Sequence, residues 1–105
     1  MSAGGGAAAN PVRGEVELRA GGRAWVMRPS FAALVAAESE LGSLWTLVER
    51  TAAGDLRLGE AVALMWHCLV EPAPRELFGE AVLENGLAAA MPIVHAVLRQ
   101  VMAGR

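Results

Sequence analysis

The stretch R-G-E-V-E-L-R-A-G-G-R-A-W-V-M-R, from Arg13 to Arg28, decides how the fold begins. Its first half alternates polar and apolar residues, which places Val16 and Leu18 on one face of a half-buried strand. The pair Gly21-Gly22 can adopt the positive φ angles of a two-residue hairpin turn. The sequence therefore predicts a strand, a tight turn and a returning strand.

The returning strand carries Trp25 and Met27 on one face and Val26 on the other. Together the two strands make a β-hairpin over residues 14–28. A lone hairpin is only marginally stable in water. It must therefore lie on the rest of the chain or pair with another molecule.

Helical patterns follow the hairpin. Ser30 and Ser43 stand where N-cap residues are needed, and Gly42 is placed to end the first helix in a left-handed conformation. The spacing of apolar residues places Phe31, Leu34, Val35 and Leu41 on one stripe of that helix. The predicted helices cover residues of about 31–41, 44–52, 58–70, 75–84 and 87–102.

The helix over 58–70 has the clearest apolar face, which carries Leu58, Val62, Met65, Trp66 and Leu69. We expect it to be the central core helix, ended by the prolines that follow. A further proline, Pro92, either kinks the last segment or opens a new helix there. The expected fold is mostly α with an N-terminal β-hairpin, an α+β bundle of four to five short helices.

Length and composition indicate one domain. The chain has 105 residues, of which 54% are hydrophobic and only 5% aromatic, so the core must be built mainly from Ala, Leu and Val. We expect a Gly/Ala-rich disordered lead-in over 1–12 and a single domain over 13–103. The net charge of −2, with no cluster of basic residues, argues against a nucleic-acid-binding surface.

The single cysteine, Cys68, fits a reducing compartment, so a cytoplasmic location is expected. The first residues lack the basic and apolar regions of a secretory signal. The most apolar window, 87–98, is interrupted by Pro92 and His95 and is shorter than the roughly 20 residues that a bilayer requires. A membrane span is not expected.

No set of residues indicates catalysis, a metal or a cofactor. The nearest cluster is Glu60, His67, Cys68 and Glu71, but its spacing is not that of a zinc motif and the side chains diverge on a helix. The serines lack a partner base, and the glycines form no phosphate-binding loop. We expect no catalytic, metal-binding or cofactor-binding residue.

Tryptophans are the candidates for a partner contact, because aromatic residues dominate interface energetics. Trp66 falls on the core face of its helix. Trp25 and Trp45 are predicted partner-binding residues, with core packing as the open alternative. Trp45 is preferred because it points away from the apolar stripe of its own helix.

Four motifs in order carry a resemblance to a known family. They are R-G-E-V with the G-G turn, L-V-A-A-E-S-E-L-G-S-L (Leu34–Leu44), A-G-D-L (Ala53–Leu56) and G-L-A-A-A (Gly86–Ala90). Over about residues 10–101 the chain resembles the small tail-assembly chaperones of gene transfer agents and related phages. The resemblance implies a small cytoplasmic, non-enzymatic helper that engages the tape-measure protein and tail-tube subunits before the tail tube polymerises.

Two other functions remain open. Some descriptions of the family call it a tail tube protein, so a structural tail tube component is the first alternative. A small helical regulator or DNA-binding module is the second, because the Gly42-Ser43 turn between two helices superficially suggests a helix-turn-helix. An enzyme is the least supported class. The sequence leaves the formation of a homo-oligomer open.

Overall fold

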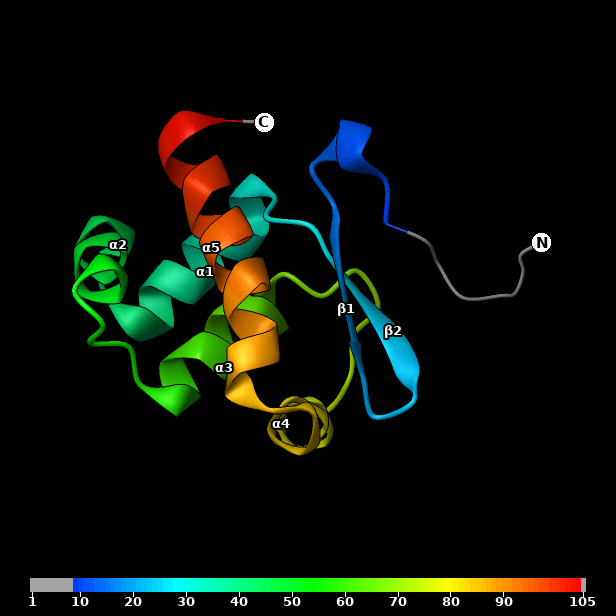
Figure 1. Ribbon diagram of the computed structural model, residues 1–105. Coiled ribbons are helices and arrows are strands. Elements are labelled where there is room, and N and C mark those ends of the chain that lie inside the picture. The colour runs from blue at the N-terminus through cyan, green and yellow to red at the C-terminus, as the bar shows by residue number, and fades with distance from the viewer. Residues whose placement is uncertain (1–8, 105) are drawn as a thin grey trace.

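The structure is a computed structural model and describes residues 9–104. Within these residues a two-stranded hairpin lies against one side of a bundle of five helices, which confirms the predicted α+β class (Figure 1). The elements are a 3-10 turn Pro11–Arg13, β1 Val16–Ala20, β2 Arg23–Met27, α1 Phe31–Leu41, α2 Leu44–Ala52, α3 Leu58–His67, α4 Arg75–Asn85 and α5 Leu87–Ala103.

The lead-in expected over 1–12 lies largely outside the described residues. Its last residues enter the 3-10 turn, where the Asn10 side chain accepts the Val12 N–H at 3.0 Å. The Glu15 carboxylate in turn accepts the Asn10 N–H at 2.9 Å. These two hydrogen bonds stabilise the turn that leads into β1.

The hairpin has the predicted strands and turn. Leu18 pairs with Trp25 and Val16 with Met27 in an antiparallel ladder. Gly21 and Gly22 have φ angles of 61° and 77°, as a two-residue turn that matches the twist of the strands requires. Leu18, Trp25 and Met27 are buried against the helices, so the hairpin supplies one wall of the core.

A segment after α3 closes the outer edge of β2. The Arg28 N–H donates to the Cys68 carbonyl at 2.7 Å, and the Val70 N–H donates to the Val26 carbonyl at 2.9 Å. Val26, on the face opposite Trp25, is buried beside this segment. The prediction that the third helix extends to residue 70 is therefore wrong, because the backbone beyond His67 pairs with β2 instead of continuing the helix.

The caps of α1 and α2 are confirmed. Ser30 Oγ accepts the Ala33 N–H at 3.2 Å, and Ser43 Oγ accepts the Thr46 N–H at 3.3 Å. Gly42 ends α1 as predicted, but its φ of 84° and ψ of −167° differ from the predicted left-handed helical conformation. The two helix axes meet at 75°, so α2 turns away from α1 at this break.

The central position expected for the third helix is also confirmed, since α3 packs against α1, α4 and α5. Its middle residues, 61–65, are all buried. Leu58 is an exception to the predicted core face: it begins the helix and is 43% exposed.

α4 and α5 match their predicted bounds to within one residue and are separated at Gly86. α5 runs through Pro92 as one helix, so the expectation that Pro92 opens a new helix is wrong. The largest fully buried side chains of the core are Met27, Leu47, Leu64, Met65, Cys68, Phe78, Val82, Val94 and Val97.

Among the described residues no single helix is long and apolar enough to cross a membrane. The pairs α1 with α2 and α4 with α5 reach that length and hydropathy only together, and each pair is sharply bent at its break.

Candidate interaction surface

An open apolar groove lies between α1, α2 and the last turns of α5. Its volume is about 550 Å³. Most of its lining side chains are aliphatic or aromatic. The lining residues are Phe31, Leu34, Val35 and Glu38 of α1, Leu44 and Trp45 of α2, and Gln100, Val101 and Met102 of α5.

Large hydrophobic side chains stand exposed along this groove. Phe31 is 84% exposed, Trp45 61%, Val35 46% and Met102 44%. Exposed apolar side chains that gather in one place mark sites of protein–protein contact more often than isolated ones do. We call this groove, with all of its lining residues, the α1–α2–α5 groove.

The position of Trp45 follows from the way α2 starts. Ser43 caps the helix, so Leu44 and Trp45 are its first two residues. Successive helical residues differ by about 100° in direction. Leu44 and Leu47 point into the core and are 6% and 1% exposed, and Trp45 consequently faces the groove.

Phe31 and Val35 share an apolar stripe with Leu34 and Leu41 by their spacing, but these two side chains are exposed. The only fully buried residue of α1 is Ala37, with Leu34 and Leu41 partly buried beside it. α1 packs against α3 through Ala37, and Phe31 and Val35 are exposed. Because α1 is apolar on most sides, its periodicity alone does not single out the buried stripe.

Trp25 does not share this surface. Its side chain is 2% exposed, and its indole N–H donates to the Ala20 carbonyl at 2.9 Å. The ring meets Phe78 edge-on, with centroids 4.9 Å apart, and Arg23 lies over it at 3.8 Å. The assignment of Trp25 to a partner contact is therefore corrected: its indole is a core group in this fold.

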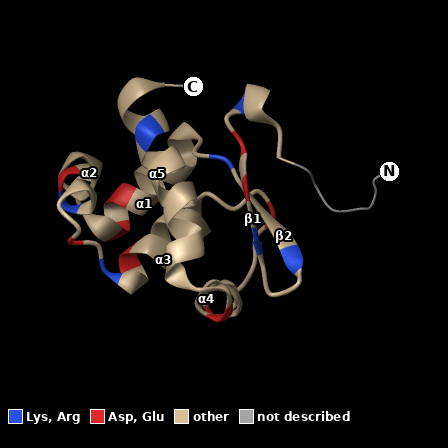
Figure 2. Ribbon diagram, viewed as in Figure 1, with Lys and Arg blue, Asp and Glu red and all other residues tan. Residues whose placement is uncertain are grey.

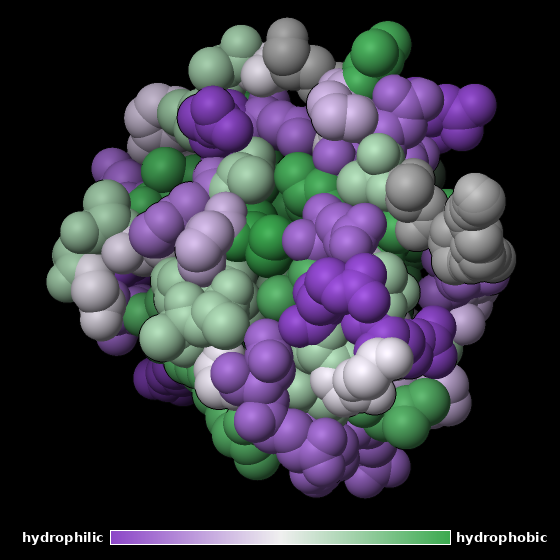
Figure 3. All heavy atoms as spheres, turned by 45° about the vertical axis from the view of Figure 1, so that its right-hand side comes forward, coloured by the Kyte–Doolittle hydropathy of each residue, from purple (hydrophilic) through white to green (hydrophobic). Residues whose placement is uncertain are grey.

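The two candidate tryptophans lie on opposite sides of the molecule. The hairpin that holds Trp25 and the helix α2 that holds Trp45 are at the right and left of Figure 1. Figure 3 brings the hairpin side forward, where hydrophilic residues cover much of the surface and hydrophobic ones show between them. Trp45 alone remains as a candidate for partner binding.

The polar groups near the groove are committed to the fold. The Glu38 carboxylate accepts the Leu44 N–H at 3.0 Å, across the break between α1 and α2. The Gln100 amide donates to the Gly14 carbonyl at 2.8 Å, while its Oε1 is buried without a partner among the described residues. The groove therefore offers mainly apolar surface to a ligand.

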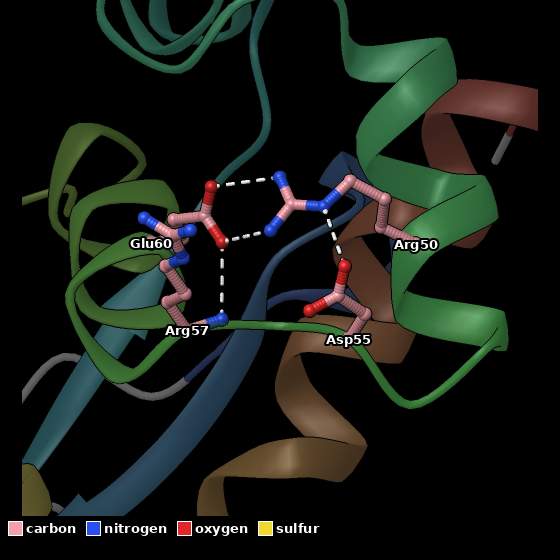
Figure 4. Close-up of polar contacts among 4 residues, drawn as sticks. All are labelled: Arg50, Asp55, Arg57 and Glu60. Atoms are coloured by element: carbon pink, nitrogen blue, oxygen red, sulfur yellow. Dashed lines mark hydrogen bonds and ion pairs between the residues drawn. The ribbon is translucent and has the colours of Figure 1, made fainter.

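An ion-pair cluster fixes α2 against α3 (Figure 4). Arg50 reaches from α2 to the Glu60 carboxylate with two hydrogen bonds, at 2.7 and 2.8 Å, and also contacts Asp55 at 3.4 Å. Glu60 accepts the Arg57 N–H as well, at 3.0 Å. The Arg50 guanidinium, followed by this backbone bond, lowers the pKa of Glu60 to about 2.

A second cluster joins α1 to the ends of α3 and α4. Glu40 accepts two hydrogen bonds from Arg75, at 2.6 and 2.8 Å, and lies 2.8 Å from His67 Nε2. Arg75, followed by His67, lowers the pKa of Glu40 to about 2. The Arg75 guanidinium also covers the partly buried ring of Trp66 at 4.4 Å.

These two clusters hold apart residues of the set Glu60, His67, Cys68 and Glu71, which was the nearest candidate in the sequence for a metal or catalytic site. Glu60 and His67 bond to different partners at opposite ends of α3, and Cys68 is buried. Within residues 9–104 no group of three or more His, Cys, Asp or Glu side chains is arranged to hold a metal ion. Figure 2 shows basic and acidic residues dispersed over several elements.

Arg50, the basic residue of the would-be recognition helix α2, is held by Glu60 and Asp55. An arginine engaged in this way is poorly placed to neutralise a phosphate. The helix-turn-helix alternative therefore loses its main cationic group.

Comparison of the chain with known proteins identifies its family. The chain matches the family model described as phage tail tube protein, GTA-gp10, over residues 13–104. No curated protein and no solved structure matches the chain. The match covers the hairpin, all five helices and the α1–α2–α5 groove. The chain thus belongs to the phage tail tube protein, GTA-gp10 family.

Proposed function

We propose that this protein is a non-enzymatic tail assembly chaperone of a phage-like or gene transfer agent tail, acting in the cytoplasm. Its partner is a segment of the tape-measure protein or of a tail-tube subunit. The observation that carries the proposal is the α1–α2–α5 groove, with Phe31 and Trp45 exposed along it. An amphipathic helix can lay its apolar face into such a groove.

The chemistry of the groove suits a transient partner. Its lining is mainly apolar, so it can cover hydrophobic surface that would otherwise aggregate before assembly. A single small groove gives a modest interface, which polymerisation of the tube can displace. The net charge of −2 helps to keep the complex soluble.

A structural tail tube component is the second candidate, favoured by the description of the family as a tail tube protein. The two roles differ in whether the protein is present in the assembled particle. A chaperone leaves the partner when the tube forms, whereas a tube component remains in the particle. Immunoblotting of purified particles separates the two roles.

The experiment is co-expression with the tape-measure protein and, separately, with the tail-tube subunit of the same gene cluster. Size-exclusion chromatography with light scattering then measures the mass of any complex. We expect a soluble complex with one of the two partners. An insoluble partner beside a free 11.0 kDa protein would contradict the proposal.

Trp45→Ala tests the groove itself. As a central aromatic contact, Trp45 should contribute about 2 kcal/mol to binding, so the variant should bind roughly 30-fold more weakly. Leu83→Ala is the matched control, because Leu83 is 56% exposed on α4, outside the groove. Equal affinity of the wild type and Trp45→Ala would remove Trp45 from the interface.

A further inference from the structure

The outer edge of β1 carries peptide groups that the fold does not use. In the hairpin, Ala20 pairs with Arg23 across the two-residue turn, so residues 16, 18 and 20 exchange hydrogen bonds with β2. The peptide groups of Glu17 and Arg19 therefore point away from β2. No hydrogen bond between described residues uses the N–H or C=O of either one.

The other edge of the sheet, on β2, is covered by the chain itself. The outward peptide groups of β2, at Val26 and Arg28, bond to the segment Cys68–Val70. β2 is thus covered by its own chain. A strand with an unpaired edge is a template for pairing with another strand.

The side chains along this edge alternate in charge. Glu17 and Arg19 lie on the outer face of β1 and contact each other at 3.3 Å. Their side chains are 29% and 75% exposed. Sheet edges that must not pair with another chain are usually protected by a proline, by a bulge, or by charges that repel a second copy. β1 is a regular five-residue strand without proline.

We propose that β1 pairs antiparallel with β1 of a second copy of this chain, about a two-fold axis at Leu18. The two hairpins then form one four-stranded sheet. Glu17 lies opposite Arg19 of the second copy, and Arg19 lies opposite its Glu17. Each of these two facing pairs exchanges two backbone hydrogen bonds, because both members present outward peptide groups.

The charges select this register over its neighbours. A two-residue shift in one direction puts Glu17 opposite Glu17 of the second copy and Arg19 opposite Glu15, whose carboxylate is nearly buried and already accepts the Asn10 N–H. A shift in the other direction puts Arg19 opposite Arg19. Like charges directly opposite each other destabilise a strand pair, whereas opposite charges stabilise it. A one-residue shift would put Glu17 and Arg19 opposite residues whose peptide groups point to their own β2, so the backbone hydrogen bonds between the copies could not form.

The dimer goes beyond the proposed function and does not depend on it. The hairpin and α2 lie at opposite sides of the molecule, so the Trp45 side of the α1–α2–α5 groove stays clear of the paired strands (Figure 1). The α5 side of the groove is closer to the hairpin, because Gln100 bonds to the Gly14 carbonyl and α5 packs against β1. One dimer would present two grooves. Because the contact consists of one strand edge and exposed ion pairs, its affinity should be in the micromolar range or weaker.

Sedimentation velocity of the full chain over a range of concentrations tests the proposal. We expect a reversible monomer–dimer equilibrium that weakens with added salt. Glu17→Arg and Arg19→Glu should each be monomeric, because each places like charges opposite each other. Far-UV circular dichroism checks that both variants remain folded.

Mixing the two variants is the decisive measurement. In the mixed dimer each introduced arginine faces an introduced glutamate, and the native Arg19 faces the native Glu17. The mixture should therefore recover the dimer that neither variant forms alone. In the wild type, amide exchange at Glu17 and Arg19 should slow as the concentration rises. A wild type that is monomeric at all concentrations, or a dimer that both single variants retain, would overturn the proposal.

Discussion

Arg50 and Glu60 are joined by two parallel hydrogen bonds, Nη1 to Oε2 at 2.8 Å and Nη2 to Oε1 at 2.7 Å. They lie ten residues apart, and their pairing closes the loop between α2 and α3 (Figure 4). Paired arginine and carboxylate groups in this two-point geometry are among the stronger polar contacts in proteins. The contact holds α2 in place, and with it the groove residue Trp45.

Removal of this carboxylate should destabilise the fold. Glu60→Ala breaks both bonds to Arg50 and the bond from the Arg57 N–H, and we expect a loss of about 1–2 kcal/mol in the free energy of unfolding. Urea denaturation measures it. Glu49→Ala is the control, because Glu49 is an exposed carboxylate on the neighbouring helix. Equal losses in the two variants would show that the Arg50–Glu60 contact adds no stability.

Acid should weaken the fold through Glu40 and Glu60. Arginine partners lower the pKa of each to about 2 from an ordinary value of 4.5. A depressed pKa in the folded state gives stability that is present above pH 4.5 and is lost as the pH falls toward 2. The urea midpoint of the wild type should therefore drop between pH 5 and pH 2.5. In the double variant Glu40→Gln/Glu60→Gln this drop should be smaller, and an equal slope would contradict the assignment.

Much of the fold could be predicted from local patterns. The caps Ser30 and Ser43, the Gly21-Gly22 turn and the break at Gly86 each express a backbone rule that acts within a few residues. Such rules fix where elements begin and end. The end of α3 was missed because it depends on hydrogen bonds to β2, a strand some forty residues earlier in the chain.

The candidate site was predicted less well, for a related reason. Trp45 was placed correctly on the outside because Leu44 and Leu47 define a clear stripe on α2. Trp25 was not, because a hairpin residue is buried or exposed according to what covers its face, and Phe78 covers this one. The exposure of Phe31 depends on which face of α1 packs on α3, which apolar spacing does not encode.

The two tryptophans should respond differently to truncation. Trp25→Ala leaves a cavity beside Phe78 and removes the bond to the Ala20 carbonyl, so we expect a loss of about 3 kcal/mol or more in stability. Trp45→Ala removes a side chain that is 61% exposed and should change stability by less than about 0.5 kcal/mol. Thermal and urea unfolding measure both. A large loss for Trp45→Ala would place that side chain in the core instead.

Gly21 and Gly22 should differ although both have positive φ. A Cβ on Gly21 would lie 3.1 Å from the Ala81 Cβ of α4, whereas a Cβ on Gly22 would meet nothing within 4 Å. Gly22→Ala should therefore cost about 1 kcal/mol from backbone strain alone. Gly21→Ala adds the contact with α4 and should cost roughly 1 kcal/mol more. Equal costs, measured by urea denaturation, would show that α4 yields to the added methyl group.

Cys68 should be inert while the protein is folded. The thiol is buried, with 1% of the residue exposed, and burial raises its pKa to about 12. A thiol reagent attacks the thiolate, which at pH 8 is then on the order of a thousandfold scarcer than in an unfolded chain. Alkylation should be complete in guanidinium and very slow in buffer, as mass spectrometry would show.

The slow reaction in buffer requires an opening of the structure that exposes the thiol. The Cys68 carbonyl accepts the Arg28 N–H, so the thiol becomes accessible when the segment Cys68–Val70 leaves the edge of β2 or when the whole chain unfolds. Glu60→Ala lowers global stability at a distant site. If labelling of this variant is faster in proportion to its loss of stability, the edge opens only by global unfolding. If its labelling rate equals that of the wild type, the edge opens on its own, and β2 then offers a second strand edge for transient pairing.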